Sequence, residues 1–162
     1  MVAELRAPWL SSESQSWATI LQASHQRAFG RPLLANQPQD PAAIATSCQT
    51  LFAATACVLA HDGGQDPRLV YVNAAALQLW RRRWEQMVGM PSRLTAPPGE
   101  RTERASALSQ AGRVDAYQGY RGIRIDSQGR RFLIDNARIW TLWDTRGQRC
   151  GQAASFTRWW WI

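Results

Sequence analysis

The stretch that decides the fold is Arg68-Leu-Val-Tyr-Val-Asn-Ala-Ala-Ala-Leu-Gln-Leu-Trp80. Its first five residues are mostly apolar and β-branched or aromatic, which is typical of a strand. Asn73 is a favoured helix N-cap, because its side-chain oxygen can accept a hydrogen bond from a free backbone N–H of the first turn. Ala76, Leu77 and Trp80 then share one helical face. The stretch therefore predicts a strand that passes directly into a short capped helix.

Four more segments have the pattern of strands, and the last three of them are joined by two turns that contain glycine. Thr55–His61 is an apolar run that ends at Asp-Gly-Gly, so it is the expected hairpin partner of Arg68–Val72. Near the C-terminus, apolar and polar residues alternate around Ile123 and Ile125. The last three expected strands surround these isoleucines and then cover Arg130–Trp143 and Arg149–Phe156. Together the five segments predict a single antiparallel sheet.

Three further helices are expected. The first begins near Ser12, where Ser12 and Gln15 have capping-box spacing, and ends at Gly30. The second has Asp40 as its N-cap, Pro41 at its first position, and an apolar stripe of Ile44, Cys48, Leu51 and Phe52. The third, a charged helix over Glu100–Ala111 that Gly112 terminates, has few apolar residues and should lie on the surface as a connector.

These elements predict an α+β domain with helices on one face of a five-stranded sheet. We divide the chain into a helical extension over residues 1–53, the sheet domain over residues 54–158, and a Trp-rich tail over residues 159–162.

Composition limits the possible functions. The chain has 162 residues, is 45% apolar and has no apolar run near the ~20 residues of a membrane span. Three widely spaced cysteines and no apparent signal peptide favour a reducing cytoplasm. All 19 basic residues are Arg, so Schiff-base chemistry and a lysine phosphate loop are excluded. The net charge of +7 fits an anionic partner, but the arginines are scattered, which also fits simple solubility.

The order of these elements resembles that of a PAS domain, and five short motifs narrow the match. These are Pro91-Ser-Arg-Leu-Thr-Ala96, Glu103-Arg-Ala105, Gly122-Ile-Arg-Ile125, Gly129-Arg-Arg-Phe132 and Gly151-Gln-Ala-Ala154. Together with the leader Leu21–Leu34 they are similar to the MEKHLA family, a PAS-related group found as stand-alone bacterial proteins and as the C-terminal domain of certain plant transcription factors. The resemblance spans roughly residues 17–158.

The resemblance implies a PAS-like sheet and a sensory or regulatory role. It supplies no established activity and no agreed ligand, so the cofactor is unknown. The expected function is a non-enzymatic module that binds a small molecule, mediates protein–protein association, or does both. Because the chain contains no kinase, cyclase or DNA-binding domain, its output should pass to a separate effector protein or act through a homodimer.

A small-molecule site should combine a few polar groups with aromatic ones. On the helical wall and the three C-terminal strands, the candidate residues are Asn73, Arg93, Tyr117, Arg124 and Trp140. Arg93 could hold a carboxylate or phosphate with two hydrogen bonds. Its alternative role is an ion pair or backbone contact that fixes the Pro91–Leu94 turn.

Two other functions are weighed against this one. A redox protein would hold flavin or haem. For flavin, the helix after Asn73 lacks the cysteine of light-sensing PAS domains, and Cys57 fits a buried strand instead. For haem, only His25 and His61 could ligate the iron. A nucleic-acid adaptor would use Trp80-Arg-Arg-Arg-Trp84, unless both rings pack inward and the arginines face water. No metal-binding pattern and no catalytic pair is apparent.

Nine tryptophans are the most unusual feature of the composition. Trp140 and Trp143 have an odd separation on one strand, which predicts opposite faces of the sheet. Trp159, Trp160 and Trp161 should not form a free coil, since exposed indoles would make a sticky patch. They either pack against the N-terminal segment near Trp9 and Trp17 or form a dimer contact. The candidate interaction surface is therefore Trp17, Trp159, Trp160 and Trp161.

Overall fold

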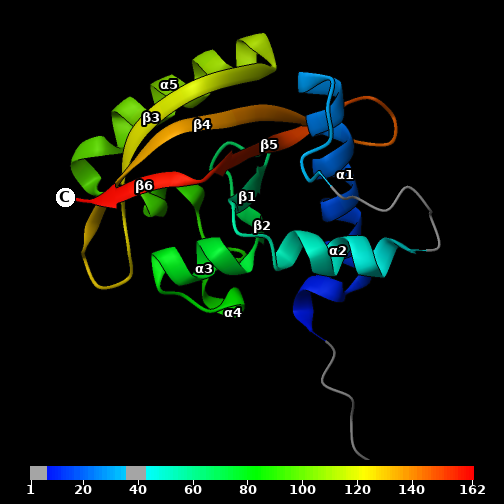
Figure 1. Cartoon of the computed structure of the whole chain (residues 1–162). Helices are drawn as coiled ribbons and strands as arrows, with labels where there is room; N and C mark the ends of the chain where they lie inside the picture. The colour runs from blue at the N-terminus through cyan, green and yellow to red at the C-terminus, as the bar shows by residue number, and fades with distance from the viewer. Residues whose placement is uncertain (1–6, 36–42) are drawn as a thin grey trace, which may run out of the picture.

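A computed structural model describes residues 7–35 and 43–162. Its strands form one antiparallel sheet in the order β2-β1-β5-β4-β3, in which β6 continues beyond β5 and pairs with β4 (Figure 1). The prediction that five segments join edge to edge is confirmed. The strand bounds are β1 Cys57–Asp62, β2 Leu69–Val72, β3 Ala116–Ile125, β4 Arg131–Trp143, β5 Arg149–Phe156 and β6 Arg158–Trp161.

Helices precede the sheet in the chain and interrupt it after β2. The α-helices of the described residues are α1 Ser12–Phe29, α2 Ile44–Phe52, α3 Ala74–Trp80, α4 Trp84–Met87 and α5 Arg101–Val114. Short 3₁₀ turns cover Pro8–Leu10, Ser92–Thr95 and Pro98–Glu100. None of these helices is long and apolar enough to cross a membrane.

The helix ends differ from the sequence predictions in two places. Ser11, not Ser12, caps α1, and its hydroxyl accepts a hydrogen bond from the Ser14 backbone N–H at 3.1 Å. The prediction that Gly112 ends α5 is wrong, because the helix continues to Val114. The residue that ends it is Asp115, in the left-handed conformation, whose carboxylate accepts hydrogen bonds from Thr141 and Arg149. The expected cap of α2 at Asp40 and Pro41 lies outside the described residues.

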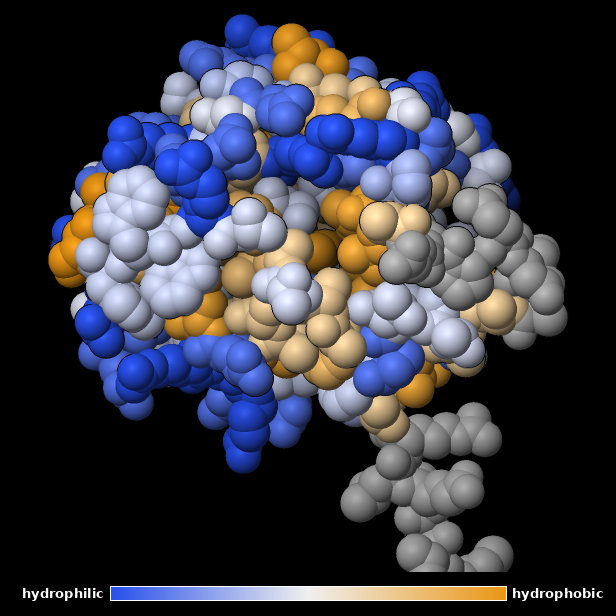
Figure 2. Space-filling view, viewed as in Figure 1, coloured by the Kyte–Doolittle hydropathy of each residue, from blue (hydrophilic) through white to orange (hydrophobic). Residues whose placement is uncertain are grey.

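Helices cover both faces of the sheet. Residues alternate along β1, so that Cys57 packs with α3 and α5 on one side while Val58 and Ala60 pack with α1 and α2 on the other. The N-terminal helical extension thus covers the face opposite the helices that follow β2 (Figure 1). Figure 2 shows apolar residues gathered at the middle of one surface, over the position of α3.

The opposite orientation expected of Trp140 and Trp143 stays a prediction, because arginines associated with α1 and with α5 both reach the Trp143 ring. Trp140 is fully buried against α1 and donates a hydrogen bond from its indole to the Leu21 carbonyl at 3.1 Å. The Arg149 guanidinium, which donates to the Gly112 carbonyl of α5, lies 5.0 Å from the centre of the Trp143 ring. The guanidinium of Arg27, on α1, lies 3.8 Å from the centre of the Trp143 ring.

The Trp-rich segment expected as a separate tail is a strand of the sheet. Its strand, β6, places Trp161 opposite Phe132 and Trp159 opposite Ile134 of β4. The expectation that the tryptophans at 159–161 do not form a free coil is confirmed. The alternative that they pack against the N-terminal segment is wrong. Trp9 stacks instead on Phe52, with ring centres 3.7 Å apart.

The side chain of His25, on the face of α1 that packs against the sheet, is fully buried. Its Nδ1 lies 3.0 Å from the Arg31 carbonyl, its Nε2 faces the Arg138 guanidinium at 3.3 Å, and its ring meets that of Trp140 edge-on. A carbonyl accepts and a guanidinium donates, so this geometry requires a neutral ring with its proton on Nδ1. Burial, with smaller effects from Arg138 and Arg31, lowers the pKa of His25 from 6.5 to about 4.

We predict that His25 makes the protein sensitive to mild acid. The unfolded chain binds a proton at His25 near pH 6.5 and the folded chain only near pH 4, so the free energy of unfolding falls as the pH drops between these values. The loss is up to about 3 kcal/mol. Urea denaturation from pH 7.5 to 4.5 should give a flatter pH dependence for His25→Gln than for wild type. Gln26→Ala, at an exposed position of the same helix, is the comparison variant and should keep the wild-type slope. An unchanged slope in His25→Gln would contradict the prediction.

Candidate ligand cavity

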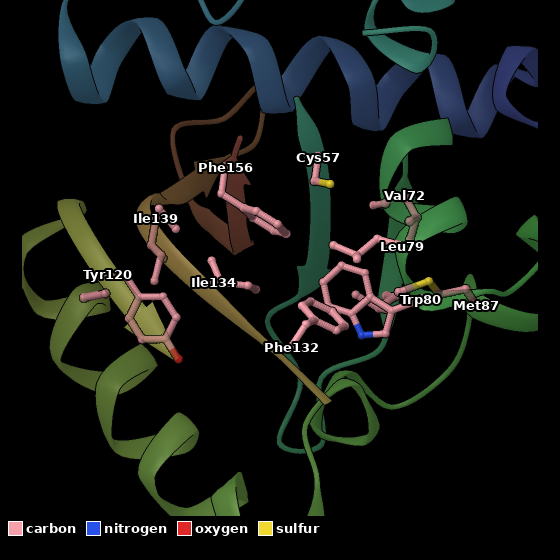
Figure 3. Packing of buried hydrophobic residues seen from close by; sticks show 14 residues of the cluster. Cys57, Val72, Leu79, Trp80, Met87, Tyr120, Phe132, Ile134, Ile139 and Phe156 are labelled. Carbon is pink, nitrogen blue, oxygen red and sulfur yellow. The ribbon is translucent and has the colours of Figure 1, made fainter. Parts of the chain in front are cut away.

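A small cavity lies between α5 and the sheet, inside the core that α3 helps to close. Its volume is about 40 Å³. Figure 3 shows Tyr120, Ile134, Ile139 and Phe156 on one side of this core and Trp80 across from them. The residues that line the cavity are mostly apolar: Leu59, Ala60, Leu69, Trp80, Leu108, Ile134, Ala137, Ile139, Ala153, Ala154 and Phe156, joined by the polar His61, Thr95, Arg104, Tyr120, Arg124 and Gln152.

Two arginines are buried in the wall of this cavity. Arg104, in the first turn of α5, is 8% exposed, and Arg124, near the end of β3, is 6% exposed. Within residues 7–35 and 43–162, neither forms an ion pair with a carboxylate. The buried Nε of Arg104 also has no hydrogen-bond partner there. Such groups are costly, since burial removes the charge from water without replacing its partners.

The two arginines repel each other electrostatically. Burial, and secondly the charge of Arg124, lower the pKa of Arg104 to about 10, while Tyr120 acts in the opposite direction. At neutral pH the Arg104 guanidinium therefore remains charged. The polar wall of the cavity carries positive charge without a described negative counterpart.

Arg124 is held in place by its own strand. Its guanidinium donates one hydrogen bond to the Tyr120 hydroxyl and one to the Ile123 carbonyl, each at 2.9 Å. Gly122 lies between Tyr120 and Arg124 on β3, and a Cβ there would sit 2.8 Å from the Tyr120 ring and 3.0 Å from Arg124. The missing side chain at Gly122 lets the tyrosine lie across the strand and meet the arginine.

His61 and Gln152 separate the cavity from the outside. Both also line an open groove of about 310 Å³ beside the β1–β2 loop and the end of α5. The Gln152 amide donates to the Leu108 carbonyl at 3.1 Å, and His61 Nδ1 lies 2.7 Å from the Asp62 carbonyl. Burial lowers the pKa of His61, so its ring is neutral at pH 7. Two uncharged polar side chains thus stand between the groove and the buried arginines.

Of the five predicted ligand-binding residues, the structure places only Arg124 at the cavity. Trp140 belongs to the core on the α1 side, and Tyr117 is 40% exposed on β3. Arg93 is half-exposed and forms an ion pair with Asp66 at 3.2 Å, which is its alternative role. The five residues therefore do not form one site.

Asn73, the fifth predicted residue, has its hydrogen-bonding groups occupied by backbone. Its Oδ1 accepts from the N–H groups of Val58 and Ala76, which confirms the predicted cap. Its Nδ2 donates to the carbonyls of Leu51 and Ala56 at 3.2 and 2.8 Å. An Asn amide has two such donors and can accept twice, so no group is left for a ligand.

Sequence reasoning missed Arg104, Tyr120, His61 and Gln152 as cavity residues. The helix that contains Arg104 was expected to lie on the surface because it has few apolar residues. A signal was present in its spacing, since Arg104, Leu108 and Ala111 fall on one helical face. Arg104 lies on the buried face of the helix, where helical periodicity predicts an apolar residue.

Cofactors of the alternative functions do not fit the described residues. A cavity of about 40 Å³ is far below the ~300 Å³ or more of typical ligand pockets, so neither flavin nor haem fits as the side chains stand. Cys57 is not in the cavity wall, and burial raises its pKa to about 12. His25 faces Trp140 on the other side of the sheet. No group of three His, Cys, Asp or Glu residues in the described ranges could hold a metal ion.

The tryptophans that flank Arg81–Arg83 face inward. Trp80 is buried and donates its indole N–H to the Thr95 carbonyl, while Trp84 packs edge-on against Tyr71. Rings in these positions cannot stack on nucleic-acid bases.

Solved structures with the same arrangement define the class of fold. A PAS domain of a protein from Colwellia psychrerythraea is 14% identical, with 68% of this chain and 92% of that chain covered and a TM-score of 0.59. An RNA-binding light-oxygen-voltage receptor is 17% identical over 75% of this chain and 36% of its own, with a TM-score of 0.57. The fold is that of a PAS domain. At these identities the likeness concerns the fold alone.

The family model of the MEKHLA domain matches residues 15–161, and the chain belongs to this family. The match includes α1 and all of β6, so it extends beyond residues 54–158. No curated protein matches the sequence.

We predict that Asn73→Ala strongly destabilises the fold. The change leaves the Ala56 carbonyl and the Val58 N–H without these partners, removes one of the hydrogen bonds to the Leu51 carbonyl and removes the cap of α3. The cost should be about 3 kcal/mol or more, measured by urea denaturation. Gln78→Ala, at an exposed position of the same helix, is the matched control and should change stability by less than ~0.5 kcal/mol. Equal effects in the two variants would contradict the role assigned to Asn73.

We predict that Arg104→Met makes the ligand-free protein more stable. Methionine keeps much of the packing volume and removes a buried charge that lacks a described partner, for a gain of about 1–3 kcal/mol. The control is Arg113→Met, at an exposed position of α5. A large loss of stability in Arg104→Met but not in Arg113→Met would show that Arg104 is satisfied in the folded protein.

Proposed function

We propose that this protein is a non-enzymatic sensory module that binds a small molecule in the cavity beneath α5 and passes the change to a partner protein. The observation that carries the proposal is the cavity itself: a small, largely apolar space into which a few polar side chains converge. This composition is typical of small-molecule sites. The cavity lies within the core, so a bound molecule would change the packing of the elements around it.

A chain of aromatic contacts runs from the cavity to the surface. Trp80 lines the cavity and meets Phe132 edge-on, with ring centres 5.0 Å apart. Phe132 in turn meets Trp159 and Trp161 of β6 at 6.0 and 5.8 Å. Close-packed side chains transmit displacement, because they have little free volume to absorb it. A ligand that moves Trp80 would therefore alter the position of β6.

The surface of β6 is the proposed output site. In the described residues β6 pairs only with β4, so its other edge is open. Trp160 is 39% exposed and Ile162 is 61% exposed, and Figure 2 shows pale residues of intermediate hydropathy where β6 lies. The partner is a separate effector protein or a second copy of this chain. Of the predicted interaction surface, the β6 tryptophans fit this role, whereas Trp17 is partly covered by the core beneath α1.

No observation favours an enzyme over this module. The polar groups of the cavity include no carboxylate and no cysteine, and its single histidine is neutral at pH 7. An acid–base pair or an activated nucleophile would need such groups close together.

A thermal-shift screen tests the proposed function. A library of small acids, bases and neutral compounds should contain a class that raises the Tm of the wild-type protein, because a ligand that binds only the folded state stabilises it. Ala137→Leu fills the cavity and should abolish the shift, whereas Ala105→Leu on the exposed face of α5 should retain it. If no class raises the Tm, or if Ala137→Leu responds like wild type, the proposal is wrong.

A further inference from the structure

The polar side chains that line the cavity include two hydrogen-bond donors with positive charge and no negatively charged group. Arg104 and Arg124 supply two guanidinium groups, and the Tyr120 hydroxyl already accepts a hydrogen bond from Arg124. The Gln152 amide is engaged with the Leu108 carbonyl. What the wall lacks is a negatively charged acceptor, and the described residues provide none within ion-pair distance of either arginine.

The cost of this arrangement points to a ligand. Buried arginines in proteins are normally paired, because an uncompensated charge in a low-dielectric core is strongly unfavourable. Arg104 is more than nine-tenths buried, and its Nε has no partner in the described chain. A side chain that reduces stability in the free protein is typical of a functional site.

We propose that the cavity binds the carboxylate of a short aliphatic acid, with Arg104 and Arg124 as its anion-binding residues. This inference rests on the proposed small-molecule function and names the class of ligand. The planar guanidinium group presents paired N–H donors that match the two oxygens of a carboxylate. Arg104 supplies a guanidinium group in the cavity wall, whose Nε–H has no described partner. Arg124, fixed by Tyr120 and Ile123, supplies a second positive charge.

The rest of the cavity defines the remainder of the ligand. Ile134, Ile139 and Phe156 present only carbon atoms to the space, so the body of the molecule should be apolar. The volume of about 40 Å³ corresponds to roughly three water molecules, which is the room of an acid with about two to four carbon atoms. Nucleotides, sugars and dicarboxylates are disfavoured, because their size or second polar group would meet an apolar wall.

The groove outside His61 and Gln152 offers a route for such an acid. It is also lined by Arg149, an exposed cation, although that side chain is engaged with Asp115. His61 and Gln152 line both the groove and the cavity. Movement of these two side chains would therefore connect the groove to the two arginines.

The experiment compares compounds that share a carbon skeleton and differ in charge. Acetate, propionate and butyrate are tested against their amides and amines by thermal shift and isothermal titration calorimetry at fixed ionic strength and neutral pH. The acids should bind, and the amides and amines should bind at least tenfold more weakly. Arg104→Met and Arg124→Met should each lower the affinity for the best acid at least tenfold, whereas Arg113→Met should bind like wild type.

Each outcome decides the matter. Equal binding of acid and amide, or undiminished acid binding by both Met variants, overturns the carboxylate assignment but leaves the small-molecule function intact. The same follows if only compounds without a carboxylate bind. If nothing in the wider library binds, the proposed function fails and this inference fails with it. Should Arg104→Met not fold, Gly122→Ala replaces it, since the added methyl group displaces Tyr120 and Arg124 and should weaken acid binding similarly.

Discussion

The buried amide of Asn73 is the interaction on which the rest of the structure depends. Its hydrogen bonds connect the end of α2 at Leu51, the start of β1 at Val58 and the first turn of α3 at Ala76. A single side chain thus fixes where the β1–β2 hairpin ends and the direction in which α3 leaves it. The orientation of α3 in turn places Trp80 in the wall of the cavity. A fully satisfied polar group in a core specifies one arrangement, because any shift leaves several groups unpaired.

The sheet separates two cores with different chemistry. On the α1 side, Trp140 and His25 fill the space with interlocking rings, and the neutral histidine completes its own hydrogen bonds. On the α5 side, the packing leaves a cavity and buries two arginines without described counter-charges. The first core has the features of a structural support. The second buries charges, whereas the unpartnered groups on the α1 side, Gln22 Oε1 and the Tyr71 hydroxyl, are neutral. This difference is the reason for locating function beneath α5.

Local patterns in the sequence predicted the strands and most helix positions, because periodicity and capping depend on near neighbours. The cap at Asn73 and the αL end of α1 at Gly30 are examples. The failures concern long-range contacts. The end of α5 is set by Asp115 bonding to Thr141 and Arg149, and the Trp-rich segment joins the sheet through the pairing of β6 with β4. The cavity was predicted least well. The spacing of Arg104, Leu108 and Ala111 was visible in the sequence, but the burial of a charged residue depends on tertiary contacts, and of the predicted residues only Arg124 lines the cavity.

The most direct test of the central claim is the NMR signal of the Arg104 side chain. Its Nε–H resonance, assigned by its loss in Arg104→Met, reports on a donor that has no described partner in the free protein. The account predicts that this resonance shifts saturably when butyrate is added and stays in place when butyramide is added. A resonance that does not move with butyrate, under conditions where butyrate binds, would contradict it.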